Sequence, residues 1–163
     1  MAEAGSATGG AERFQAALAG SGLTNSVVEL PESTRTAGDA ARAVGCEVAQ
    51  ICKSLVFRAT SSGRPVLVVA CGANRVDEAA VGALIGEPIG KANAEFVREN
   101  TGFAIGGVAP IGHVVAPVTL VDEDLLSFDA IWAAAGAPNA VFRLTPDELM
   151  QLTGGQVASV KQH

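Results

Sequence analysis

The chain has 163 residues, of which 48% are apolar and 17% are charged, so it can bury the core of one domain. This composition excludes disorder over most of the length, and charged residues interrupt every apolar run before the roughly 18 residues that span a bilayer. The net charge of -6 and the scarcity of aromatic residues (six Phe, one Trp and no Tyr) argue against a general nucleic-acid binder or regulator, and no DNA partner is expected.

The first residues are small and polar, with neither the basic segment nor the hydrophobic segment of a secretory signal. We expect a flexible tail over residues 1–10, followed by one domain over residues 11–163. Cys46, Cys52 and Cys71 are odd in number and lack C-x-x-C spacing, which argues for a reducing compartment and against a disulfide framework or zinc site. The sequence therefore predicts a cytoplasmic protein without a membrane segment, metal or cofactor.

Hydrophobic periodicity and turn residues predict interleaved helices and strands. The expected helices cover residues 12–18, 36–44, 77–85, 93–100 and 145–152, and the expected strands cover 26–30, 51–59, 65–71, 114–121, 130–135, 140–144 and 156–160. Several strands are joined by turns that are too short for parallel crossovers. The predicted fold class is therefore α+β, a single domain with a mixed sheet and surrounding helices.

Lys53 is the first candidate functional residue. On an alternating strand it shares a face with Ile51, Leu55 and Phe57, whereas Ser54 lies on the other face. Burying an unpaired ammonium is costly. Either the stem covers the core while the charged end reaches water, or Lys53 lines a cavity and donates to a phosphate or carbonyl oxygen. The pattern alone leaves both interpretations open.

A loop over residues 101–112 is the second candidate. It contains four glycines and one proline, so its backbone can approach a ligand closely and offer N–H groups to a carbonyl or an oxyanion. The alternative is a purely structural loop. A serine triad is disfavoured, because the chain has no G-x-S-x-G motif and its two histidines are His113 and the terminal His163.

Taken together and in this order, these segments resemble the YbaK/prolyl-tRNA-synthetase-associated family of editing domains. The resemblance extends over about residues 12–160, and its motifs are QICKSLVF at 50–57, PVLVV at 65–69, RVD at 75–77, TGF at 101–103, GGVAP at 106–110, IWAAAG at 131–136 and LTP at 144–146. It implies a partly barrel-like mixed sheet. It also implies hydrolysis of the ester of mischarged aminoacyl-tRNA, with no cofactor or metal.

The resemblance also implies roles for particular residues. Lys53 and Gly106 are the expected catalytic residues, and water is the expected nucleophile. Substrate contacts are expected from Leu30, Ser54, Gly107, Val108, Pro110 and Ala134. The expected partners are the acceptor end of mischarged tRNA and prolyl-tRNA synthetase. A non-catalytic, synthetase-associated module that binds an aminoacyl-tRNA or nucleotide end is the alternative function.

The chain departs from the family pattern in the substrate pocket. Members that act on cysteinyl-tRNA carry a hydroxyl and a carboxylate where this chain has Ala134 and Val141, and a pocket tyrosine near the position of Leu30. Among the small residues expected on prolyl-tRNA (alanine, 2-aminobutyrate or cysteine), the more apolar pocket therefore favours the first two.

Overall fold

The computed structural model describes residues 2–30 and 36–163, with side chains from residue 9 onward. Its helices are α1 (Ala2–Gly20), α2 (Ala37–Val44), α3 (Glu78–Ile85), α4 (Ala94–Thr101) and α5 (Pro146–Thr153), with short 3₁₀ helices η1 (Val48–Gln50) and η2 (Glu123–Ser127). The strands are β1 (Val27–Glu29), β2 (Cys52–Ala59), β3 (Pro65–Cys71), β4 (Ile89–Lys91), β5 (Val118–Asp122), β6 (Ile131–Ala134), β7 (Ala140–Leu144) and β8 (Gln156–Ala158).

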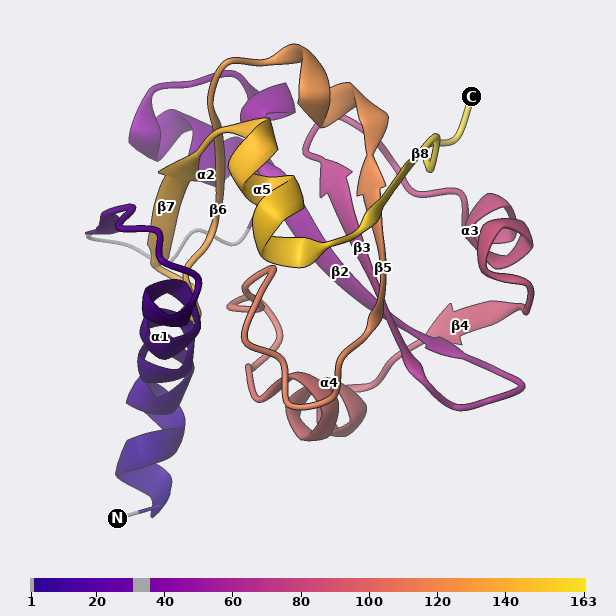
Figure 1. Cartoon of the computed structure of the whole chain (residues 1–163), viewed down its shortest axis with the longest axis horizontal. Coiled ribbons are helices and arrows are strands. Elements are labelled where there is room, and N and C mark those ends of the chain that lie inside the picture. The colour runs from indigo at the N-terminus through magenta and orange to yellow at the C-terminus, as the bar shows by residue number, and fades with distance from the viewer. Residues whose placement is uncertain (1, 31–35) are drawn as a thin grey trace.

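The strands form two sheets, which Figure 1 shows on the left and right of the molecule. One has the order β1-β7-β6 and is antiparallel; the other has the order β4-β2-β3-β5-β8 and is mixed. An isolated bridge between Ile51 and Trp132 joins them. The α+β prediction with a mixed sheet is therefore confirmed, and the strands curve around the core in two sheets instead of closing into one barrel.

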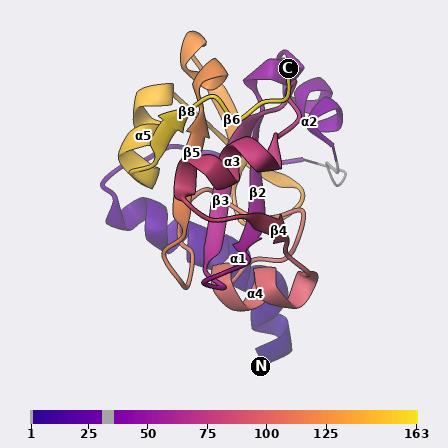
Figure 2. The same cartoon turned by 90° about the vertical axis from the view of Figure 1, so that its right-hand side faces the viewer.

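The β2–β3 hairpin is the centre of the larger sheet. Cys52 pairs with Cys71 and Arg58 with Pro65, and the turn contains Gly63 at φ +78°. All seven residues of β3 are buried, because α3 covers one face of the sheet and the main core covers the other. Figure 2 shows α3 crossing in front of β2 and β3.

The main core lies between the two sheets. Phe14 and Leu18 of α1, Leu149 of α5 and Phe142 of β7 pack there. The side chain of Thr145 accepts a hydrogen bond from Glu148 N, and Glu148 accepts one from Thr145 N, so a capping box begins α5.

Three elements differ from the sequence-based expectations. Helix α1 begins at Ala2 and continues through the expected boundary between residues 10 and 11, where Gly10 packs so closely on Gly136 that a Cβ would lie 2.2 Å from its carbonyl oxygen. Strand β4 lies between the expected helices at 77–85 and 93–100, where no strand is expected from the sequence. β5 begins at Val118 instead of residue 114, because Val114 N and Val115 N donate to Thr101 O and Asn100 O at the end of α4.

None of the helices in the described part of the chain is both long enough and apolar enough to cross a membrane.

Candidate functional site

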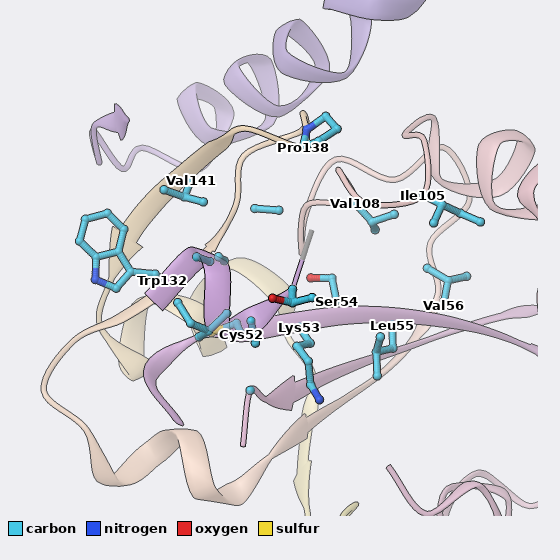
Figure 3. A pocket seen from close by; sticks show the side chains of 18 of the residues that line it. Cys52, Lys53, Ser54, Leu55, Val56, Ile105, Val108, Trp132, Pro138 and Val141 are labelled. Carbon is cyan, nitrogen blue, oxygen red and sulfur yellow. The ribbon is translucent and has the colours of Figure 1, made fainter. Parts of the chain in front are cut away.

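A cavity of about 710 Å³ opens between the two sheets, where β2 faces β6, β7 and the glycine-rich loop. It brings together Lys53 and Ser54 of β2, Gly106 and Val108 of the loop, and Ala134 of β6. The start of α2 and Trp132 complete its wall. Figure 3 shows Val108 and Ile105 above β2, with Val141 on the far side of the space. Residues more than 80 positions apart in the sequence therefore share one cavity.

Strand β2 presents two chemically different faces to its surroundings. Leu55 and Phe57 pack with Val66 and Val68 on the α3 side, as the alternation predicted, whereas Val56 packs toward the main core. In Figure 3 Lys53 and Leu55 point to one side of β2, and Ser54 points to the other, toward the loop. Because Lys53 and Ser54 are adjacent, their side chains leave opposite faces of β2, although both residues line the cavity.

The Lys53 ammonium is held by the backbone beyond β3. Its Nζ donates a 2.6 Å hydrogen bond to the carbonyl of Asn74. Burial lowers the pKa of Lys53, while the nearby Cys71 and Asp122 act in the opposite direction. No carboxylate in the described ranges forms an ion pair with it. Two of its three N–H donors thus remain for a ligand, although the ammonium points away from the loop.

Sequence analysis missed the hydrogen-bond network that positions the Asn74 carbonyl. The Asn74 side-chain amide donates to Asp122 Oδ2 at 2.9 Å and to Asp124 Oδ2 at 2.8 Å, and Lys161 Nζ contacts the same Asp124 oxygen at 2.9 Å. Asp122 is completely buried and also accepts from the Cys71 backbone N–H. An acid at the end of an apolar strand, as Asp122 is in β5, is the signal that could have indicated this network.

The glycine-rich loop has one open position and one packed position. Gly106 is exposed with φ +94°, and a Cβ added there would meet no atom within 4 Å. A Cβ on Gly107 would lie 3.0 Å from the backbone of Ala137, so this glycine serves close packing. The open side of Gly106 lets a ligand approach the backbone.

The loop is held by two side chains that the sequence analysis did not assign to the site. His113 Nε2 donates to Ala109 O at 2.7 Å, and the His113 ring stacks edge-on against Phe103 with ring centroids 5.7 Å apart. On the surface, Arg13 of α1 donates to Gly112 O at 3.1 Å. Within the described residues, His113 Nδ1 is buried and has no hydrogen-bond partner.

The far end of the cavity is apolar. Ala134 and Val141 are cross-strand partners on β6 and β7, and Val108 lies on the loop opposite them. Ser54 Oγ is the polar exception, because it is buried and has no hydrogen-bond partner in the described part of the chain. Cys52 also lines the cavity, but burial, followed by the neighbouring Cys71 and Asp122, raises the pKa of its thiol.

Three of the predicted substrate-binding residues do not line this cavity. Leu30 is in the core and its backbone is tied to Asn139 by a 2.7 Å hydrogen bond. Gly107 and Pro110 are buried beside the cavity wall. They shape the loop instead of lining the cavity. Ranges 2–30 and 36–163 contain no group of His, Cys, Asp and Glu that could hold a metal ion.

The chain belongs to the family of aminoacyl-tRNA editing domains, whose model matches residues 31–152. It is 32% identical to the "Uncharacterized protein YwhH" of Bacillus subtilis, covering 82% of this chain and 84% of that protein. It is 28% identical to the "Putative Cys-tRNA(Pro)/Cys-tRNA(Cys) deacylase EbsC" of Enterococcus faecalis, covering 79% of each.

A solved structure described as "a putative trans-editing enzyme for prolyl tRNA synthetase" superposes with a TM-score of 0.89 and 51% identity, over 94% of this chain and 98% of that one. The crystal structure of the hypothetical protein APE2540 superposes with a TM-score of 0.84 and 31% identity, over 92% and 99%. The predicted family and its fold are therefore confirmed.

Proposed function

We propose that this protein is a trans-editing deacylase that hydrolyses the ester of mischarged tRNA. Its substrate is prolyl-tRNA that carries a small wrong residue, with alanine and 2-aminobutyrate preferred over cysteine. The observation that carries this proposal is one cavity shared by Lys53, the open backbone of Gly106 and the apolar Ala134–Val141 pair. Membership of the editing family and the names of the relatives support the same activity.

Water is the nucleophile in the proposed reaction. Cys52 is the one cavity-lining thiol among the described residues, and its raised pKa keeps it protonated and unreactive. The water oxygen attacks the ester carbonyl while its proton is relayed through the free hydroxyl of the terminal ribose toward the ester oxygen. The tetrahedral intermediate then expels the ribose oxygen, which takes up a proton.

The chain contributes positioning and charge stabilisation to this reaction. The Gly106 backbone approaches the carbonyl oxygen on which negative charge develops, a kind of interaction worth about 10²–10³ in rate for one donor. The Lys53 ammonium supplies the positive charge of the site. Ser54 Oγ accepts a hydrogen bond from the substrate's α-amino group, which gives this buried hydroxyl the partner it lacks.

Specificity follows from the size of the apolar end. Ala134, Val141 and Val108 exclude long side chains by steric clash, but one methylene more or less changes selection by only about 10–200-fold. Alanyl and 2-aminobutyryl esters should therefore be overlapping substrates. Such an editing site is needed because a synthetase pocket is equally unable to reject a residue that is merely smaller.

The test is a deacylation panel on tRNA charged with alanine, 2-aminobutyrate, cysteine, serine, threonine and proline, with and without prolyl-tRNA synthetase. We expect rapid hydrolysis of the two small aliphatic esters on prolyl-tRNA, weaker hydrolysis of serine and little of proline. Tight binding of these substrates without any hydrolysis would assign the alternative function of a binding module. A requirement for added synthetase would identify it as the delivering partner.

A further inference from the structure

The exposed face of the smaller sheet continues from the apolar end of the cavity. Ala134 pairs with Val141, and two residues along the same strands Trp132 pairs with Arg143. Side chains two positions apart lie on one face of a strand, so the two pairs form neighbouring rows. The opposite face, with Ala133 and Phe142, is buried in the main core. A small apolar pair is thus followed directly by an aromatic and a cationic side chain.

Trp132 is shared by two cavities. It lines the 710 Å³ cavity that contains Lys53, and it also lines a second cavity of about 400 Å³, together with Arg143. Figure 3 shows the indole beside Val141 at the edge of the first cavity. The chain has one Trp and no Tyr, so this large aromatic ring is unique in the sequence.

Arg143 supplies a free positive charge beside this ring. Its side chain is exposed, and no carboxylate within residues 2–30 and 36–163 forms an ion pair with it. Of the two acids that line the second cavity, Glu148 already accepts hydrogen bonds from Thr145 N and the Asn25 amide, whereas Asp129 is exposed. Asp129 is therefore the acid whose negative charge most opposes the binding of an anion beside Arg143.

We propose that Trp132 and Arg143 form a nucleotide subsite, in which the indole stacks on a purine base and the guanidinium contacts its 5′-phosphate. This inference rests on the proposed function, because the nucleotide is the 3′-terminal adenosine of the tRNA. The Cα atoms of Ala134 and Trp132 are separated by two strand residues, about 6.8 Å. This span fits an acyl side chain at Ala134 and an adenine at Trp132, joined through the ester and the ribose. Stacking on an aromatic ring and pairing of Arg with phosphate are the usual ways to bind such an end.

The primary experiment uses the wild-type protein and its own fluorescence. Because Trp132 is the only Trp, quenching of indole emission reports on this position alone. Adenosine 5′-monophosphate should quench saturably in the millimolar range or below, adenosine should bind about 2–5-fold more weakly, as expected for loss of one exposed charge contact, and ribose 5-phosphate should not quench. A linear, collisional response to adenosine 5′-monophosphate, or equal affinity for adenosine, would overturn the proposal.

Two variants assign the contacts, and a third variant serves as the matched control. Arg143→Gln should bring the affinity for adenosine 5′-monophosphate down to that for adenosine, and Asp129→Asn should raise it. Arg58→Gln removes another exposed arginine that lines neither cavity, and should change nothing. Unaltered affinity in Arg143→Gln contradicts the assignment of the phosphate contact.

Deacylation kinetics separate this inference from the proposed function. Replacing Trp132 by Leu should raise KM about 5–150-fold, the range expected for loss of one base–aromatic contact, and Trp132→Phe should recover much of that loss. Saturable quenching by the mononucleotide without any deacylase activity would overturn the enzyme and leave the subsite standing. Deacylation with an unchanged KM in Trp132→Leu would overturn the subsite and leave the enzyme.

Discussion

The strand wall and the loop wall of the cavity are held in place by different interactions. β2 lies inside the larger sheet, paired with β3 along its length and with β4 on its other side. The segment after α4 instead depends on a few contacts, above all His113 to Ala109 O and Arg13 to Gly112 O. Substitutions on β2 should therefore change the chemistry of the site and leave its frame intact. Substitutions behind the loop should act through the position of the backbone.

Replacing Lys53 by Ala tests the strand wall and should have the largest effect. We expect single-turnover deacylation of the proline tRNA mischarged with alanine to fall by 10² or more, because the site loses its cation. The melting temperature should change little, since the side chain is only half-buried and its single hydrogen bond goes to Asn74 O.

Lys91→Ala is the matched control, because this exposed β4 lysine lies outside the cavity. If Lys53→Ala kept wild-type turnover and melting, the lysine would be a surface group whose stem merely covers apolar atoms.

Gly106→Val tests the loop wall. A β-branched residue at φ +94° should lower the free energy of unfolding by about 1–3 kcal/mol, and its side chain would occupy the open space beside the backbone. Deacylation should fall by more than the loss of stability explains.

Gly86→Val separates these two effects. Gly86 also has a positive φ, +87°, and open space around it, but it ends α3 and does not line this cavity. It should cost similar stability and leave activity intact. Equal activity losses in the two variants would mean that backbone strain alone acts and that Gly106 does not face the ester.

Ala134→Val sharpens the assignment of the apolar end. Added methyl groups should reduce hydrolysis of 2-aminobutyryl-tRNA more than that of alanyl-tRNA, within the roughly 10–200-fold range that one methylene can provide. The two substrates serve as controls for each other in kcat/KM measurements. Equal losses for both would show that Ala134 does not gauge side-chain length. A wild-type preference for seryl-tRNA would instead mean that Ser54 Oγ binds the substrate hydroxyl.

The same contrast explains what could be predicted from the sequence. The β2–β3 hairpin was predictable because local alternation and a Ser-Ser-Gly turn determine it, and Lys53 stood out as a cation on an apolar face. The network behind Lys53 was not predictable, because Asp122 reaches Asn74, the residue that binds the Lys53 ammonium, only through the β3–β5 pairing, a contact between distant segments. Leu30 was placed in the pocket by resemblance, yet the β1–β7 pairing carries it into the core.

His113 gives the loop wall a pH dependence. Burial, helped by the charge of Arg13 and opposed by the hydrogen bond to Ala109, lowers the pKa of His113 below 6.5. At pH values between the lowered pKa of the folded chain and the ordinary value of 6.5, the unfolded chain binds a proton at His113 that the folded chain does not. Stability is thus full above pH 6.5 and falls on acidification, by at most about 1.4 kcal/mol per pH unit for one group.

His113→Gln should keep a donor to Ala109 O but remove the titration. Its free energy of unfolding, measured by denaturant titration at several pH values, should vary less between pH 7 and pH 5 than that of the wild type. Deacylation at neutral pH should be retained, whereas His113→Ala should reduce it through displacement of the loop. Parallel pH profiles for wild type and His113→Gln would show that other groups cause the acid sensitivity.

Cys52→Ala is the smallest expected change, and it tests whether the strand wall supplies a nucleophile. The thiol lies in the cavity beside Lys53, so a covalent acyl-enzyme is the obvious rival to attack by water. Because burial and the neighbouring Cys71 and Asp122 raise its pKa, the thiolate is scarce at neutral pH and the sulfur acts as a small apolar group. Single-turnover deacylation by Cys52→Ala should therefore stay within about threefold of wild type, with a stability loss of about 1 kcal/mol for the deleted sulfur atom. Loss of activity comparable to that of Lys53→Ala, together with a trapped thioester in the wild type, would make Cys52 the nucleophile and reduce Lys53 to the group that lowers its pKa during catalysis.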